Sequence, residues 1–145
     1  MAGFDQLKLE NQLCFPLYTA SRLVTRLYQP LLKEFGLTYT QYLILLVLWE
    51  EGDLSVSDIG KNLFLESNTL TPLLKRMESK KIIKRERASD DERRVVISLT
   101  DLGREMEIKA CEIPGKLIDS VGGEFTMKRV LNLQRELATL IHILK

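Results

Sequence analysis

The sequence predicts a mainly α-helical fold of the α+β class with one small β-hairpin. Apolar residues recur at helical spacing on both sides of residues 82–99, and only within that region does the pattern change to the alternation typical of strands. The chain has 145 residues, of which 45% are hydrophobic and 28% are charged, so it can bury a core of ordinary size. It contains no low-complexity run and no internal repeat.

Residues 13–32 are predicted to form the first helix, with apolar side chains at Leu13, Leu17, Val24, Leu27 and Leu31. Pro16 is tolerated only near a helix start, which places Cys14 in the first turn. A thiol there lies at the positive end of the helix dipole, which favours its thiolate form. Tyr18 follows four residues later on the same face. Pro30 predicts a bend near the other end of this helix.

The next helix is predicted to be the central buried one. Residues 42–50 are apolar on all sides, so no face of this helix suits solvent. Thr38 or Thr40 is a candidate N-cap, and Gly52 ends the helix. Residues 53–54 could then supply a short third strand beside the hairpin.

Two short helices joined by a polar turn are predicted in residues 55–79. Ser55 followed by Asp58 is typical of a capped helix start. A polar joint at residues 66–68 leads into a second helix with one apolar stripe, formed by Leu70, Leu73, Leu74 and Met77. Pro72 has no N–H to donate, so this helix must begin only about one turn earlier.

The opposite face of this second helix is polar and cationic. Amide and hydroxyl groups suit base edges in the major groove of DNA, and Lys and Arg suit guanine or phosphate. The N-terminal end of such a helix usually points into the groove. The candidate DNA-binding residues on this helix are Ser67, Asn68, Thr69, Thr71, Lys75 and Arg76. Taken alone, such a face is more often a solvated surface.

Residues 82–87 and 93–99 are predicted to form the two strands of the hairpin, with a polar turn at 88–92 between them. The hairpin would project beyond the helices as a wing. Asp91 is expected to fix a neighbouring arginine in one rotamer through a bidentate pair. A guanidinium at the base or flank of the wing can enter the narrow minor groove, and the candidates are Arg93 and Arg94.

The order of these elements indicates a winged helix-turn-helix, and hence DNA binding, more strongly than any one of them does. The formal net charge of +1 would argue against a nucleic-acid-binding protein if charge were spread evenly. Residues 73–94, however, contain nine Lys or Arg against five Asp or Glu. We therefore expect double-stranded operator DNA as a partner.

Two further helices are predicted after the hairpin. Thr100 caps a helix over residues 101–112, and the Pro-Gly pair at 114–115 stops it. Cys111 lies on the apolar side of that helix, where a buried and inert thiol is expected. Thr126 starts the last helix, whose apolar stripe comprises Val130, Leu133, Leu137, Leu140, Ile141 and Leu144.

A terminal apolar stripe of this length predicts a partner surface. We expect a homodimer, which suits the twofold symmetry of most operators. Residues 1–36 and 101–145 would form a helical dimerisation region, and residues 37–100 would form the DNA-binding region of the same intertwined domain. Packing within the subunit is the alternative explanation for part of the stripe.

Several other classes of protein are disfavoured. No apolar run reaches membrane-spanning length, and the N-terminal residues lack the apolar stretch of a signal peptide, so a cytoplasmic protein with no membrane partner is expected. Two cysteines in a reducing compartment do not make a disulfide framework. The single His excludes a His-rich metal site, and neither a metal nor a cofactor is expected.

Residues 53–100 resemble the multiple antibiotic resistance regulator (MarR) family of dimeric winged-helix repressors. The resemblance is carried above all by Asp91-Glu92-Arg93 followed by Ile97-Ser98-Leu99-Thr100. The organic hydroperoxide resistance regulator (OhrR) branch is similar in residues 8–15, which contain Cys14, and in residues 70–78. Tyr18, Tyr28 and Leu37-Thr38-Tyr39 extend that similarity, which runs from Phe4 to about Gly115.

The resemblance implies a reduced dimer that represses a hydroperoxide-detoxifying gene and releases its operator when an organic hydroperoxide oxidises an N-terminal cysteine. Carried over, Cys14 is that cysteine. Tyr28 and Tyr39 match tyrosines that reach it across the dimer interface, and Tyr18 matches a further tyrosine near the site. On the DNA side the matching positions are Ser67, Thr69, Thr71, Arg76, Arg93 and Asp91.

The expected chemistry is attack of a thiolate on the peroxide bond to give a sulfenic acid, which a second thiol can trap as a disulfide. A low-molecular-weight thiol or, less favoured, Cys111 would supply the second thiol. The main alternative is a repressor of the same fold that senses a small aromatic ligand, and a broader thiol-redox regulator is a further one. A thiol peroxidase would leave residues 53–100 unexplained, so no enzymatic activity is expected.

Overall fold

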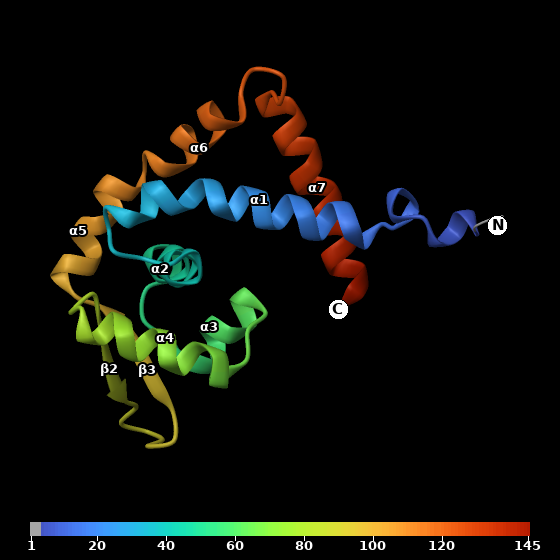
Figure 1. Cartoon of the computed structure of the whole chain (residues 1–145). Coiled ribbons are helices and arrows are strands. Elements are labelled where there is room, and N and C mark those ends of the chain that lie inside the picture. The colour runs from blue at the N-terminus through green and yellow to red at the C-terminus, as the bar shows by residue number, and fades with distance from the viewer. Residues whose placement is uncertain (1–3) are drawn as a thin grey trace. The chain divides into compact units, whose positions relative to one another are not determined.

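The computed structural model describes residues 4–145, so the first three residues of the predicted segment 1–36 lie outside the described part. The chain divides into two compact units, Met1–Cys111 and Glu112–Lys145. In the first unit, two short 3₁₀ turns, η1 (Asp5–Leu7) and η2 (Leu9–Asn11), precede α1 (Cys14–Lys33), α2 (Tyr39–Glu51), β1 (Leu54–Ser55), α3 (Val56–Leu63), α4 (Ser67–Ser79), β2 (Ile83–Arg87), β3 (Val95–Leu99) and α5 (Asp101–Ala110) (Figure 1).

Helix α1 begins at Cys14, one residue after the predicted start, and it runs through Pro30. It continues for three more residues to Lys33 and then ends through Gly36, whose φ of +63° is favoured by glycine. The N–H of Leu37 donates to the carbonyl of Leu32 at 3.1 Å across this end. One missing N–H in the last turn of a helix, at Pro30, therefore does not end it.

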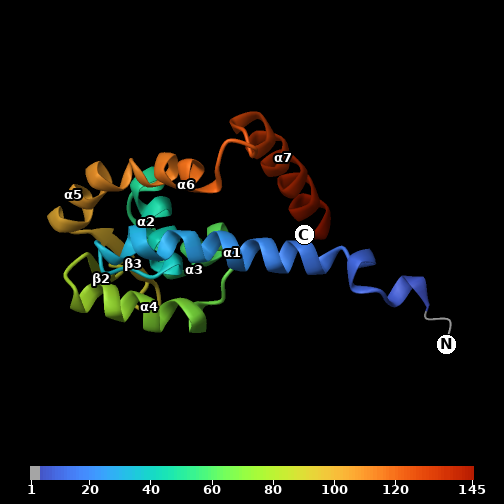
Figure 2. The same ribbon diagram turned by 45° about the horizontal axis from the view of Figure 1, so that its top comes forward.

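Helix α2 is the centre of the first unit, as predicted. It contacts α1, α3, α4 and α5, and both views place it among them (Figures 1 and 2). Thr38 is its N-cap, since the Thr38 hydroxyl accepts from the N–H of Gln41 at 3.4 Å and the Gln41 side chain accepts from the Thr38 N–H at 3.1 Å. Ile44, Leu45 and Leu48 are buried.

The helix-turn-helix and wing follow the predicted order, which confirms the fold class. The Ser55 hydroxyl accepts from the N–H of Asp58 at 3.1 Å and so caps α3. Helix α4 starts at Ser67, and its stripe of Leu70, Leu74 and Met77 is buried. The three strands form an antiparallel sheet in the order β1-β3-β2, with Arg85 opposite Ile97. The loop of this hairpin extends away from the helices beyond α4 (Figure 1).

The second unit contains α6 (Ile113–Val121) and α7 (Met127–Leu144). Helix α6 corrects the prediction that residues 114–115 only stop a helix. Pro114 instead occupies the first turn of α6, where its missing N–H removes no intrahelical bond. Helix α7 is capped by Thr126, as predicted, and several of its apolar side chains stay exposed in the single chain, including Leu131, Leu133 and Ile141.

Whether residues 1–36 and 101–145 act together as a dimerisation region stays a prediction. Within residues 4–145, no helix combines the length and the apolar character that crossing a membrane would require.

Candidate functional site: a nucleic-acid interface and a thiol–tyrosine pair

The polar face of α4 is exposed as predicted. The side chains of Ser67, Asn68, Thr69, Lys75 and Arg76 reach solvent. Thr71 is half-buried, and its hydroxyl donates to the carbonyl of Ser67 at 2.7 Å. The first turn of α4 therefore presents hydroxyl and amide groups, while Lys75 and Arg76 supply positive charge further along the same helix. This arrangement suits a helix that reads base edges and contacts phosphates.

Asp91 and Arg93 lie together in the loop of the wing. The Asp91 Oδ1 atom accepts from the backbone N–H of Arg93 at 3.0 Å and from Arg93 Nε at 3.3 Å. One carboxylate oxygen thus holds both the backbone and the side chain, so the predicted bidentate fork is wrong in detail although the two residues pair. The Arg93 side chain is 93% exposed, so its guanidinium can reach an external partner. Both Arg93 and Arg94 precede β3 instead of belonging to it.

Cys14 is the first residue of α1, and it is exposed. Tyr18 lies one turn further on and is 63% exposed. The guanidinium of Arg22 lies 5.3 Å from the centre of the Tyr18 ring, which places a cation beside this end of the helix. The thiol is therefore accessible to a small oxidant, in agreement with the predicted position in the first turn.

Tyr28 and Tyr39 form a second group, at the other end of α1. Their ring centroids are 4.8 Å apart, and Tyr42, which was not among the predicted site residues, lies 5.9 Å from Tyr28. Burial, with the neighbouring Tyr39 and Tyr42 as smaller causes, raises the pKa of Tyr28 to about 12. Burial likewise raises the pKa of Tyr39. Both phenols are therefore neutral hydrogen-bond donors at physiological pH.

The two groups do not meet within one chain. Tyr28 lies fourteen positions after Cys14 along α1, and at 1.5 Å per residue this is about 21 Å along one helix. A contact between the thiol and these phenols therefore requires a second copy of the chain.

Cys111 is exposed, so the prediction of a buried thiol is wrong. The buried side of α5 is formed by Gly103, Met106 and Ala110, and the helix ends at Ala110. Cys111 lies one residue beyond this stripe, and its Sγ donates to the carbonyl of Ile108 at 2.9 Å. Within residues 4–145, the His, Cys, Asp and Glu side chains form no group of three that could hold a metal ion.

A Tyr28→Phe variant tests the tyrosine group by its alkaline titration. Since the folded-state pKa of Tyr28 lies above the ordinary value of 10.0, the neutral phenol favours the folded state. The contribution of the neutral phenol to the free energy of unfolding is complete below pH 10 and is lost as pH rises towards 12. We expect phenolate absorbance of the folded wild type to include a late component near pH 12 that the variant lacks. Ionisation of every tyrosine in one step near pH 10 by the folded protein would contradict this.

The family model of the transcriptional regulators SarA/Rot matches residues 26–109. The organic hydroperoxide resistance transcriptional regulator of Bacillus subtilis is 53% identical over 115 residues, which cover 79% of this chain and 78% of that protein.

Solved structures of AbfR, a protein of Staphylococcus epidermidis, are similar in three states. Reduced AbfR bound to DNA has a TM-score of 0.78 and 41% identity, covering 97% of this chain and 98% of AbfR. Overoxidised AbfR bound to DNA has a TM-score of 0.73 and 43% identity, covering 94% and 97%. Disulfide-formed AbfR has a TM-score of 0.68 and 44% identity, covering 95% of each chain.

Proposed function

Because this chain belongs to the MarR family of winged-helix transcriptional regulators, and to its organic hydroperoxide resistance branch, we propose that it is a homodimeric repressor that releases its operator when an organic hydroperoxide oxidises Cys14. The chain is a DNA-binding transcriptional regulator and not an enzyme. The homodimer, the effector, the role of Cys14 and the release of DNA on oxidation are proposed.

The observation that carries the proposal is the placement of an exposed thiol and a pair of neutral phenols at opposite ends of α1. A second chain would bring Cys14 of one subunit against Tyr28 and Tyr39 of its partner. Exposed apolar side chains on α1, including Leu23, Val24 and Leu27, support such a partner surface. In the reduced dimer the phenols would donate hydrogen bonds to the thiolate.

In the proposed reaction the Cys14 thiolate attacks one oxygen of the hydroperoxide. An S–O bond forms, the O–O bond breaks, and the leaving alkoxide takes up a proton to become an alcohol. The sulfur is oxidised by two electrons to the sulfenic acid, and the peroxide is reduced by the same two electrons. The sulfur then loses its negative charge and accepts the Tyr28 and Tyr39 hydrogen bonds poorly. This loss would free Cys14 to react with a second thiol, and the resulting disulfide would shift the dimer towards a spacing of its two α4 helices that no longer fits DNA.

The state that leaves DNA is proposed to be a disulfide, formed when a second thiol attacks the sulfenic sulfur, so that an S–S bond forms, the S–O bond breaks and the hydroxyl leaves as water with the thiol proton. AbfR has been solved overoxidised and still bound to DNA, and it has also been solved in a disulfide form, which together favour a disulfide as the releasing state. In this chain the second thiol would be a small cellular thiol or Cys111, whose exposure makes it reachable. A bridge from Cys14 to the partner's Cys111 requires Cα atoms within about 7 Å.

The test is binding of the reduced protein to the DNA upstream of its own gene, before and after one equivalent of cumene hydroperoxide, with and without a small thiol. We expect one oxidation per Cys14, found by mass spectrometry, and loss of DNA binding. If a Cys111→Ser variant is released only when the small thiol is present, Cys111 is the resolving thiol. Retention of DNA by the fully oxidised wild type, with and without the thiol, would refute the proposal.

A second candidate effector is a small aromatic ligand, because a hollow of about 510 Å³ lies between α1 and the start of α2. Leu32, Leu37 and Tyr39 supply apolar surface there, and Thr25 and Gln29 supply polar groups. This size and mixed lining suit a small organic molecule. Release of DNA by a phenolic acid in the absence of any peroxide would favour this function.

A further inference from the structure

A second hollow, of about 400 Å³, opens between the start of α3, the start of α4 and the wing. Three arginines line it, against the single carboxylate of Asp91, so its lining carries an excess of two formal positive charges. Two further carboxylates pair with these arginines from outside the lining, Glu78 with Arg85 and Asp90 with Arg94. The arginines are Arg85, Arg93 and Arg94. Hydroxyl groups complete its polar wall at Ser55, Ser57, Ser67 and Thr71.

Arg85 is the least expected of these residues, because a charged residue in a wing strand is normally solvated. Its position opposite the buried Ile97 turns it to the inner face of the sheet, and its side chain is only 21% exposed. Arg85 Nη1 donates to Glu78 Oε2 on α4 at 3.4 Å. Arg85 Nε is buried, and no acceptor for it lies among the described residues. A buried donor without an acceptor is costly, so a ligand that brings an acceptor would remove this cost.

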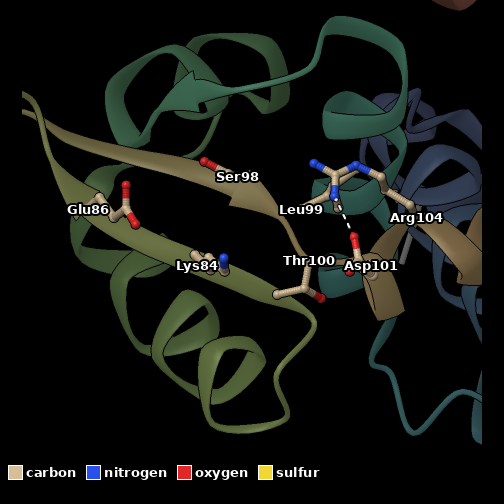
Figure 3. Close-up of a pocket in the computed structure, with 7 residues that line it drawn as sticks. All are labelled: Lys84, Glu86, Ser98, Leu99, Thr100, Asp101 and Arg104. Atoms are coloured by element: carbon tan, nitrogen blue, oxygen red, sulfur yellow. Dashed lines mark hydrogen bonds and ion pairs between the residues drawn. The ribbon is translucent and has the colours of Figure 1, made fainter.

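A hollow on another part of the wing provides a contrast (Figure 3). It measures about 280 Å³ and is lined by Lys84 and Arg104 together with Glu86 and Asp101, so its charges balance. Arg104 Nη1 donates to Asp101 Oδ1 at 3.2 Å, as the dashed line in Figure 3 marks. Excess positive charge is therefore not a general property of the wing. It occurs where the wing meets the first turn of α4.

We propose that the hollow beside α4 is a phosphate site that takes one backbone phosphate of the operator. Arg85 and Arg94 would be its cationic ligands, since a guanidinium matches the geometry of a phosphate. Ser57 and Ser67 would add hydroxyl donors, whereas the Ser55 and Thr71 hydroxyls already donate within the protein.

A DNA phosphate fits this site better than a free phosphate ion does. The hollow joins the two parts that would touch a duplex, the start of α4 and the loop of the wing, so a duplex held by both would pass over it. Of the carboxylates nearby, Asp58 is held by the Ser55 hydroxyl and by Lys61 at 3.0 Å. Asp90 Oδ1 lies 3.8 Å from Arg94 Nη2 in an exposed pair, and a phosphate can replace so weak a partner. The inference rests on the DNA-binding part of the proposed function and adds Arg85 and Ser57 to it.

The experiment compares Arg85→Gln with two matched controls. Glu78→Gln breaks the same ion pair but keeps Arg85, and Arg104→Gln removes an arginine from the charge-balanced hollow. Operator affinity is measured over a range of salt concentrations, and circular dichroism checks that each variant is folded. We expect Arg85→Gln to weaken binding about tenfold per subunit and to lower the slope of log K against log salt by about one per subunit. Both controls should bind like the wild type.

A second measurement replaces single operator phosphates with neutral methylphosphonates. One position in each half-site should weaken binding of the wild type and have no further effect on Arg85→Gln. An unchanged salt slope in Arg85→Gln, or equal losses in Arg85→Gln and Glu78→Gln, would assign Arg85 a structural role and overturn the phosphate site. If inorganic phosphate binds saturably without DNA while no methylphosphonate has an effect, the site is for free phosphate and the DNA assignment is wrong. Failure of the reduced wild type to bind any duplex would refute the function itself.

Discussion

A Cys14→Ser variant should bind operator DNA as tightly as the wild type and should stay bound after treatment with an organic hydroperoxide. A serine hydroxyl is close to a thiol in size, so the exposed first turn of α1 should fold unchanged. It cannot form a sulfenic acid or a disulfide, so the reaction that changes the hydrogen bonds from Tyr28 and Tyr39 is absent. The wild type should lose affinity by about 5- to 150-fold on oxidation, the usual range of coupling between two sites. The variant should show no change.

The measurement is fluorescence anisotropy of a labelled operator, titrated with reduced and with oxidised protein. Cys111→Ser is the matched control, since it replaces the other exposed cysteine by the same residue. Its reduced form should bind like the wild type, so any difference after oxidation reports on the resolving step alone. A Cys14→Ser protein that is released by hydroperoxide like the wild type would exclude Cys14 as the sensor and leave the hollow between α1 and α2 as the candidate effector site.

The N-caps explain why so much of the fold could be predicted from the sequence. A cap is a contact within four residues, so it depends little on tertiary structure. Thr38, Ser55, Thr100 and Thr126 each accept a hydrogen bond from the backbone of their own helix. Three of these caps are at the predicted positions, and Thr38 is one of the two candidates predicted for α2. These four residues fix the starts of α2, α3, α5 and α7, and with them the order that identifies a winged helix-turn-helix.

The local structure at Pro114 and the burial of Cys111 could not be predicted from the sequence, because both depend on the position of the residue within a helix. A proline at position 114 is compatible both with the end of one helix and with the first turn of the next, and the structure shows that it lies in the first turn of α6. Cys111 was misplaced for a related reason. The buried stripe of α5 runs through Gly103, Met106 and Ala110, and the next position along the chain is rotated from Ala110 by about 100°, which is enough to move the Cys111 side chain from the stripe to the surface.

Arg85 could have been found from the sequence by the parity of the strand. It shares alternate positions with Ile83, so it belongs to the inner face of the hairpin, and a charge there calls for a partner. By contrast, no local sequence pattern predicts a contact between Cys14 and Tyr28, because both residues lie on the same helix. That pairing depends on a second chain, and here the resemblance to known regulators carries information that residue patterns lack.

An Arg93→Ala variant should lose most of the affinity that the wing contributes to operator binding. In the wild type, the Arg93 side chain is held by Asp91 and is 93% exposed, so its guanidinium is oriented before DNA binds. Insertion of an arginine into a narrow minor groove depends on A·T-rich sequence, so the variant should also lose preference for such sequence beside the major-groove site. We expect about a tenfold loss per subunit, and about a hundredfold for a dimer with two wings if the sites are independent.

Asp91→Ala separates orientation from charge in this pair. Removal of a carboxylate near DNA would strengthen binding if charge alone decided the outcome. If Asp91 acts by holding Arg93, the variant should instead bind several-fold more weakly, and the substitution should have little effect in an Arg93→Ala background. Binding isotherms of the two single variants and the double variant, on operators with and without A·T-rich flanks, supply this cycle. Tighter binding by Asp91→Ala in both backgrounds would show that the pair is incidental and that Arg93 acts as an unoriented charge.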